Sequence, residues 1–453
     1  MKEAGLLIDF YQPSIYNESV VKKVISDFHL PLIRILKMYK SLPFSISVPL
    51  STVELWEDFG FESLISELKG LRQNENQSQN ENQGDRIEML SSSPYGVVLN
   101  GLPENIVESQ IILNEYGLGY YFGSTRGFEG EPSVVLKDVD GFVSSSSFVD
   151  DTVIKILNDL GYKWVAIENE GQRSGIFGAD NCKIKIVNTL DMFNISSGNM
   201  QKYVNEEGAD CLIIKLSPFK FCRFYENKNF SEDKSKDITS EIESFLYRLS
   251  NSPFVFRTVG KIVESKTKTP KMSKKINDVV DDGVNKFNVS KGDTKKREIN
   301  KGDKIISSMC EYLSKRFNNF SGISSREDLP VIKIWDLNSI SDINDIDLRL
   351  FLSSMIVLGK ISYIINYDYD NSIYDNIGIK GGMGDEVEGG VKGGVGDDVD
   401  DVGSGVNNET GDRVGENIID SIINSSKEKI DKLLSYIEDA DIRGNLGKIL
   451  YKQ

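Results

Sequence analysis

The chain has 453 residues and carries 53 Lys and Arg against 69 Asp and Glu, which gives a formal charge of −16. This length can bury a sizeable hydrophobic core, and the acidic balance argues against a general nucleic-acid binder. The four cysteines include no Cys-x-x-Cys pair. We therefore expect no disulfide framework and no structural zinc site, and a reducing compartment fits best.

Two apolar segments are candidates for a signal peptide or a membrane span, and neither has the sequence features of one. The N-terminus "MKEAGLLIDF" holds a short apolar run that meets an acidic residue at once, unlike a signal peptide. The longest apolar run begins at Leu348 and contains Arg349 and Lys360, which favours a buried helix over a membrane span. We predict a cytoplasmic protein without a membrane partner.

Strand and helix patterns alternate along residues 1–260. Short apolar runs typical of strands are "GLLIDF", "PFSISVPL", "IEMLSSS", "VDGFVSS", "KWVAIEN" and "DCLIIKL". Amphipathic stretches such as "STVELWEDFGFESLISELKGL" and "DDTVIKILNDLGY" lie between them and predict helices. Repeated strand–helix units with short connections imply a parallel sheet, either doubly wound or closed into a barrel.

Three segments interrupt the globular pattern. Residues 72–85 repeat NENQ and predict a disordered loop, and residues 261–304 are dense in lysine and predict a flexible insertion. Residues 377–416 form a glycine and acid repeat that cannot bury a core. Its apolar position falls out of register with calcium-binding repeats, so we predict a flexible linker and no metal site. Residues 305–376 and 417–453 have helical patterns and predict an α-helical C-terminal region.

The ends of the predicted strands are the places to look for chemistry, because function in parallel strand–helix proteins sits at the carboxyl ends of strands. In chain order these ends read "DFYQP", "SSSPYGVVLNGLP", "FVSSSSF" and "KLSPFKFCRF". They contain no histidine, and the one histidine of the chain, His29, falls inside the first predicted amphipathic helix.

These stretches resemble the motifs of glycoside hydrolase family 57, the α-amylase and 4-α-glucanotransferase family. "IDFYQPSIYNESVVKKV" matches its first motif, and "IEMLSSSPYGVVLNGLPENIVESQIILNEY" matches its second. "GFVSSSSFVDDTVIKILNDLGYKW" and "DCLIIKLSPFKFCRF" follow in the places of the third and fourth. The order holds over residues 1 to about 225. The resemblance implies a distorted parallel (β/α) barrel over residues 1–260, a role in α-glucan metabolism and no cofactor.

Each reactive position of the family is altered in this chain. Asp9 replaces the histidine before "FYQP", and Gly96 replaces the histidine that follows Tyr95. The resemblance places Ser146 at the glutamate nucleophile and Ser217 at the aspartate acid/base. The remaining family positions near Ser217 hold Phe219, Arg223 and Phe224.

The chemical consequence of these replacements is a loss of hydrolysis. Retaining glycosidases need two carboxyl groups about 5 Å apart, one to attack the anomeric carbon and one to protonate the leaving oxygen. A serine hydroxyl carries no charge and is too weak an acid for either task, and a nucleophilic serine needs a base such as histidine beside it. We expect a pseudo-enzyme that binds carbohydrate or regulates an active α-glucan hydrolase as its partner.

Other carboxylates offer an alternative, an active α-glucan hydrolase or glucanotransferase with relocated catalytic groups. The loop "STRGFEGEPSVVLKDVDGF" carries Glu129 and Glu131 in a faint copy of the third motif, followed by Asp138 and Asp140. For Glu168 and Glu170 a solvated loop is the simpler interpretation.

Several side chains at the strand ends are candidates for binding sugar. The set is Asp9, Tyr11, Gln12, Tyr95 and Trp164. Core packing accounts equally for Trp164, a backbone hydrogen bond that closes the first loop accounts for Gln12, and a bond to a neighbouring N–H accounts for Asp9. A third hypothesis is an interaction protein whose pocket is filled by Phe219 and Phe224.

Overall fold

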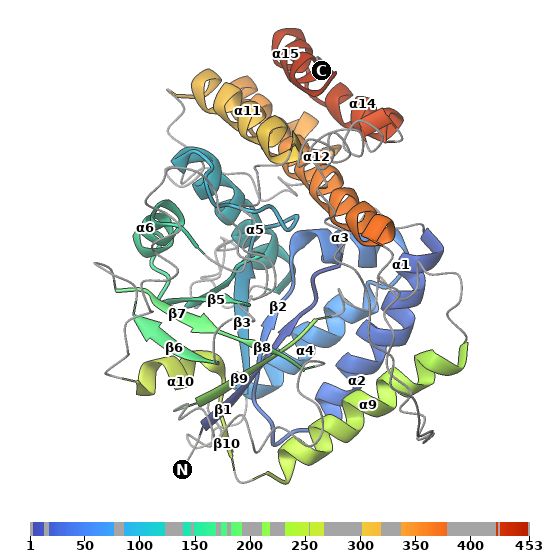
Figure 1. The fold of residues 1–453 in the computed structure, drawn as a ribbon, viewed down its shortest axis with the longest axis vertical. Coiled ribbons are helices and arrows are strands. Elements are labelled where there is room, and N and C mark those ends of the chain that lie inside the picture. The colour runs from blue at the N-terminus through green and yellow to red at the C-terminus, as the bar shows by residue number, and fades with distance from the viewer. Residues whose placement is uncertain are drawn as a thin grey trace, which may run out of the picture.

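The computed structural model describes residues 3–12, 18–76, 86–122, 139–145, 149–168, 174–178, 183–192, 211–217, 232–252, 254–266, 301–318, 337–377, 423–424 and 426–451. Within these residues one sheet of 10 strands runs through the N-terminal part (Figure 1). Its strand order is β6-β7-β5-β4-β3-β2-β1-β9-β8, and β10 also pairs with β1. The described pairings are parallel, except that β6 and β7 are antiparallel.

The strands are short, and most are almost wholly buried. They are β1 (Glu3–Asp9), β2 (Phe44–Ser47), β3 (Ile87–Ser92), β4 (Gly141–Val143), β5 (Trp164–Ile167), β6 (Gly175–Gly178), β7 (Lys185–Asn188), β8 (Leu190–Asp191), β9 (Cys211–Leu216) and β10 (Val255–Phe256). Near-continuous apolar runs such as "AGLLI" and "CLII" are what a strand covered on both faces requires.

Helices pack against the sheet and form the C-terminal part. They are α1 (Glu18–Val24), the π-helix η1 (Ile25–His29), α2 (Leu30–Met38), α3 (Leu50–Asp58), α4 (Ser63–Asn76), α5 (Glu104–Phe122), α6 (Asp151–Asp159), α9 (Glu232–Ser250), α10 (Val259–Ser265), α11 (Lys301–Arg316), the 3-10 helix η5 (Ser339–Asp342), α12 (Ile346–Ile377), α14 (Lys427–Ser435) and α15 (Ala440–Tyr451). The predicted fold class, a distorted parallel (β/α) barrel followed by an α-helical region, is confirmed.

The inner face of the sheet is identified by its packing. Ile176 of β6 and Ile213 of β9 belong to strands near opposite ends of the strand order, yet both lie in one buried apolar cluster. The sheet must therefore curl around this cluster. Val259 and Ile262 of α10 belong to the same cluster, so α10 packs against the inner face rather than the outer one.

Ser174 joins the two ends of the curled sheet. Its Oγ, just before β6, accepts a hydrogen bond from the backbone N–H of Ile213 at 2.8 Å and donates one to the Ile213 carbonyl at 3.3 Å. Both groups are buried. A single hydroxyl thus satisfies two backbone groups that would otherwise need a neighbouring strand.

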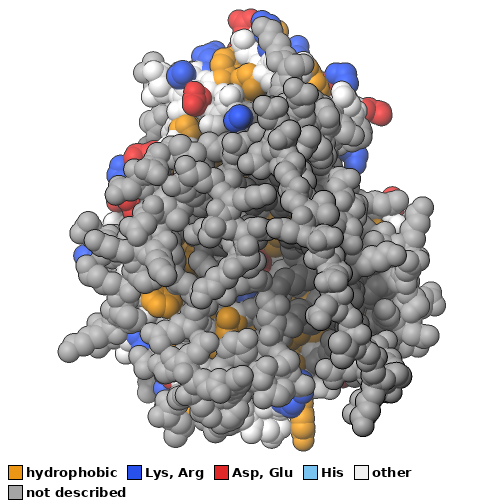
Figure 2. All heavy atoms as spheres, viewed as in Figure 1, with side chains coloured by type: hydrophobic (Ala, Val, Ile, Leu, Met, Phe, Trp, Pro, Cys, Tyr) orange, Lys and Arg blue, Asp and Glu red, His pale blue; other side chains and the backbone are white. Residues whose placement is uncertain are grey.

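The C-terminal helices pack on one another and on α5 at one end of the molecule (Figure 1). The apolar run that begins at Leu348 lies in α12, and its side chains, such as Met355 and Ile356, are buried, as the sequence predicts. None of the described helices has the length and apolar character to cross a membrane. Charged side chains of both signs are spread over this end of the surface (Figure 2).

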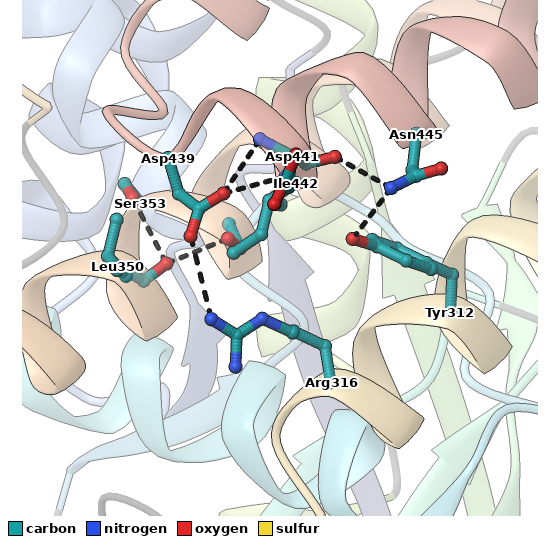
Figure 3. A network of polar contacts seen from close by, with 9 residues as sticks. Tyr312, Arg316, Leu350, Ser353, Asp439, Asp441, Ile442 and Asn445 are labelled. Carbon is teal, nitrogen blue, oxygen red and sulfur yellow. Dashed lines mark hydrogen bonds and ion pairs between the residues drawn. The ribbon is translucent and has the colours of Figure 1, made fainter.

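A polar network ties α15 to α11 (Figure 3). Asp439 precedes α15, and its Oδ1 accepts hydrogen bonds from the N–H groups of Asp441 and Ile442 at 2.8 and 2.9 Å. Its Oδ2 lies 3.5 Å from Arg316 Nη2 of α11. The carboxylate therefore caps one helix and pairs with a cation on the next.

Candidate functional site

Strand alternation predicts which side chains reach the carboxyl end of the inner face. Leu7, Ala166 and Ile213 all belong to the inner apolar cluster. Because side chains on one face recur every second residue, the next inward positions are Asp9 at the end of β1, Glu168 just after β5 and Lys215 on β9. We call this carboxyl-terminal edge of the inner face the mouth.

Three charged side chains meet at the mouth. Lys215 Nζ lies 3.2 Å from Asp9 Oδ2 and 3.5 Å from Glu168 Oε2. The side chains of Asp9, Lys215 and Glu168 are 9%, 13% and 27% exposed, so the ion pairs are largely removed from water. We call these three residues the mouth cluster. Asp9 and Lys215 come from neighbouring strands, whereas Glu168 reaches them only because the sheet curls.

The mouth cluster brings charge to this end of the barrel, although Ser146 and Ser217 stand at the positions that the resemblance assigns to reactive carboxylates. Two carboxylates lie there, and one ammonium neutralises part of their charge. Asp9 also accepts a hydrogen bond from the Tyr11 backbone N–H at 3.3 Å, which is the bond to a neighbouring N–H that the sequence suggested. Glu168 is not a solvated loop residue, since it pairs with Lys215.

Ser47 adds a polar group beside the cluster. It stands opposite Asp9 in the pairing of β1 and β2. Its side chain is buried, and its Oγ has no hydrogen-bond partner among the described residues. A buried hydroxyl without a partner is costly, so this position is suited to a ligand that supplies one.

Of the two serines predicted in place of the reactive carboxylates, the structure describes only Ser217. Ser146 lies outside the described residues, but its neighbour Ser145 donates a hydrogen bond from Oγ to the Val97 carbonyl at 3.0 Å. Ser217 follows β9 directly and is half-buried. Ser145 therefore holds the loop that follows β3.

Most of the relocated-carboxylate candidates cannot be placed. Glu129, Glu131, Asp138 and Glu170 lie outside the described residues, as do Phe219, Arg223 and Phe224. Asp140 is described and precedes β4 at the end opposite the mouth, where it pairs with Lys163 at 2.6 Å. Asp140 is therefore not a carboxylate of the mouth.

Four of the five predicted sugar-binding residues are buried, and Asp9 is one of them. Trp164 is 1% exposed at the start of β5, where it packs against Gly141 within the inner apolar cluster. Gln12 donates from its backbone N–H to Thr52 Oγ1 at 3.0 Å and from Nε2 to the Val21 carbonyl at 3.3 Å, and so closes the first loop. Tyr95 is 1% exposed beneath α12. Asp9 and the half-buried Tyr11 remain at the mouth.

His29 cannot serve as a base for a serine nucleophile. It is fully buried, and its Nδ1 accepts a hydrogen bond from Trp56 Nε1 at 2.9 Å. Its ring also packs edge-on against Phe10. Burial among these aromatic rings lowers the pKa of His29 to about 3, so the imidazole stays neutral and its accepting nitrogen is occupied.

Sequence reasoning missed Lys215. It is the one charged residue in the strand "CLIIKL", and its spacing from Ile213 places it on the inner face. That alternation is a usable signal. It also missed Glu54 and Lys360, whose pairing depends on a contact between residues far apart in the chain.

No family model matches the sequence, and no curated protein matches it either. The structure is similar to a 4-α-glucanotransferase from Thermococcus litoralis, with a TM-score of 0.48 and 11% identity over 79% of this chain. The match spans 57% of the length of that enzyme.

Two further solved structures cover nearly the whole chain. One is a branching enzyme of glycoside hydrolase family 57 from Thermococcus kodakaraensis, at TM-score 0.49 and 8% identity over 99% of this chain and 94% of that one. The other is an α-amylase from Thermotoga maritima, at TM-score 0.48 and 7% identity over 100% and 98%. The TM-scores of these three structures lie between 0.48 and 0.49.

Proposed function

We propose that this chain binds an α-glucan oligosaccharide at the mouth and does not cleave it. The observation that carries the proposal is the mouth cluster. Carboxylate oxygens accept hydrogen bonds and an ammonium group donates them, so Asp9, Glu168 and Lys215 together can hold several sugar hydroxyls. Glu168 is the most exposed of the three, with 27% of its side chain accessible, and the half-buried Tyr11 follows Asp9 by two residues. The sequence motifs around them support a glucan as the ligand.

The same cluster argues against hydrolysis. A glycosidase carboxylate must be free to attack the anomeric carbon or to carry a proton to the leaving oxygen. Here both described carboxylates are engaged by Lys215 Nζ. The two positions that the motifs assign to reactive groups hold Ser146 and Ser217. A role beside an active glucan-processing partner would use the binding alone.

Variants of the mouth cluster test the binding site. Lys215→Met should weaken maltooligosaccharide binding at least about tenfold, because it removes the donor and the cation that pairs with both carboxylates. Glu168→Gln keeps the shape of the side chain and should weaken binding by a smaller factor. Lys155→Met removes an exposed lysine that pairs with Glu104 on the outer helices and is the matched control.

The readout is isothermal titration, with thermal unfolding recorded for each variant. The proposal predicts that Lys215→Met and Glu168→Gln lose affinity while Lys155→Met does not. Equal affinity in all three variants would place the sugar elsewhere. A wild-type protein that binds no maltooligosaccharide would refute the proposed function.

Hydrolysis by Asp9 and Glu168 is a second candidate, because each carboxylate lies within ion-pair distance of the same Nζ. Carboxylates in glycosidases are separated by about 5–9.5 Å, depending on the stereochemical outcome, and this pair can fall in that range. The candidate predicts glucose release by the wild-type protein and its loss in both Asp9→Asn and Glu168→Gln. Release that persists in these variants but ceases in Glu129→Gln or Glu131→Gln would assign the chemistry to the other loop.

A further inference from the structure

The loop that follows β3, residues 93–103, connects several parts of the mouth. Its Gly96 has a φ of +66°, and a Cβ there would overlap the hydroxyl of Tyr11. Its Val97 carbonyl accepts the Ser145 hydroxyl at 3.0 Å. The loop, which we call the β3 loop, therefore contacts both the Tyr11 side chain and Ser145.

The other side of the β3 loop is held by the C-terminal helices. Tyr95 donates from its hydroxyl to Glu54 Oε1 of α3 at 3.2 Å. Lys360 of α12 lies 3.2 Å from Glu54 Oε2, and its Nζ stands 5.3 Å from the centre of the Tyr95 ring. One ammonium thus makes an ion pair and a cation–π contact at the same place.

The backbone of α12 comes close to the same ring. Gly359 has no side chain, and a Cβ at this position would lie 2.7 Å from Tyr95 Cδ2. The neighbouring contact between α5 and α12 is fixed by Gln110, whose Nε2 donates to the Met355 carbonyl at 3.0 Å. Tyr95 is therefore enclosed between α3 and α12, and the β3 loop cannot shift without disturbing α12.

We propose that Lys360 is a positioning residue for saccharide binding: it fixes Tyr95 and the β3 loop, and through them the arrangement of Tyr11 and Ser145. The inference rests on the proposed function for its ligand. It also gives the C-terminal helical region a role, because an element more than 260 residues downstream of Tyr95 in the sequence sets the rim of the mouth. Lys360 itself does not contact the sugar.

Removal of Lys360 has a definite physical consequence. Glu54 would keep its hydrogen bond from the Tyr95 hydroxyl but would lose its ion pair with Lys360. Burial raises the pKa of Glu54, and Lys360 opposes that rise. The Tyr95 ring would lose the ammonium above it. We therefore expect the β3 loop to open more often while the barrel stays folded.

The experiment compares Lys360→Met with Lys427→Met. Lys427 is a close match: it pairs with Asp431 at 3.0 Å and lies 3.8 Å from the centre of the Tyr451 ring, within the C-terminal helices. Hydrogen exchange of residues 93–103 and isothermal titration with maltoheptaose are measured on both full-length variants. Lys360→Arg, which keeps the charge, tests rescue.

The proposal predicts faster exchange in residues 93–103 and about tenfold weaker binding in Lys360→Met, partial recovery in Lys360→Arg and no change in Lys427→Met. Unchanged exchange in Lys360→Met would overturn it, and so would faster exchange with unchanged affinity. If Lys360→Met does not fold, Tyr95→Phe removes only the hydroxyl bond to Glu54 and should give the same two effects in weaker form. A wild-type protein that binds no saccharide would refute the proposed function, and faster exchange would then report a structural contact only.

Discussion

Glu88 is a buried carboxyl at the amino end of β3, below the inner apolar cluster. Its Oε2 accepts hydrogen bonds from Ser45 Oγ at 2.6 Å and from the Gly260 N–H at 3.0 Å. Burial raises its pKa to about 7. The folded state therefore binds this proton more tightly than the unfolded chain does. The stability so gained is complete below the ordinary pKa of a glutamate and is lost as the pH rises through 7.

Glu88→Gln should remove this pH dependence. The amide oxygen can accept the same two hydrogen bonds without carrying charge. At pH 8 we expect the variant to be more stable to unfolding than the wild type, on the order of 1–3 kcal/mol, with little difference at pH 5. Denaturant titrations at the two pH values measure it, with the half-exposed Glu264→Gln as control. An equal change at both pH values would contradict the account.

Gly96 tests the contact between the β3 loop and Tyr11. Gly96 and Gly161 both have a positive φ, of +66° and +91°, but a Cβ at Gly161 would meet nothing within 4 Å. Gly161→Ala should therefore cost only backbone strain, about 1 kcal/mol. Gly96→Ala should cost more, because the new methyl group collides with Tyr11. The difference between their melting temperatures measures the contact, and equal losses would show that Tyr11 moves aside freely.

Two hydrogen bonds between Ser174 and Ile213 close the curled sheet. Ser174→Ala removes both hydrogen bonds to Ile213 and leaves a buried N–H and a buried carbonyl without that partner. The expected loss is about 1–3 kcal/mol in the free energy of unfolding. Ser250→Ala, which removes an exposed hydroxyl bonded to the Tyr247 carbonyl, should change stability by less than about 0.5 kcal/mol. Similar losses in the two variants would refute the closure role.

Asp439 caps the N-terminus of α15. Asp439→Ala removes two hydrogen bonds to the helix start and the ion pair with Arg316, and should cost about 0.5–2 kcal/mol. Asp439→Asn keeps an accepting oxygen and should recover most of that loss. Thermal unfolding distinguishes the two. If Asp439→Asn were as destabilising as Asp439→Ala, the ion pair rather than the cap would hold α15.

For the whole molecule, the sequence predicts a parallel sheet because strand and helix patterns alternate with short connections, and the resemblance to glycoside hydrolase family 57 implies that this sheet forms a barrel. The strand "GLLIDF" became β1 with Asp9 at its carboxyl end, and the buried helix that begins near Leu348 became part of α12. These features depend on residues close together in the chain. Local hydrophobic pattern is enough to find them.

The candidate site was less predictable, because it depends on how the sheet curls. Periodicity places Lys215 and Glu168 at strand ends but does not say that β9 and β5 approach each other. The burial of Tyr95 depends on α12, which the loop's own sequence cannot reveal. Tyr95 and Trp164 are both buried, which their positions near strand ends do not reveal.

The most direct test of the central claim measures binding and cleavage of one saccharide in the same sample. Wild-type protein is titrated calorimetrically with maltoheptaose, and the same mixture is then incubated and its sugars are separated by chromatography. The account predicts a saturable binding isotherm and maltoheptaose recovered intact. Shorter glucans or free glucose in the chromatogram, or a titration without binding heat, would contradict it.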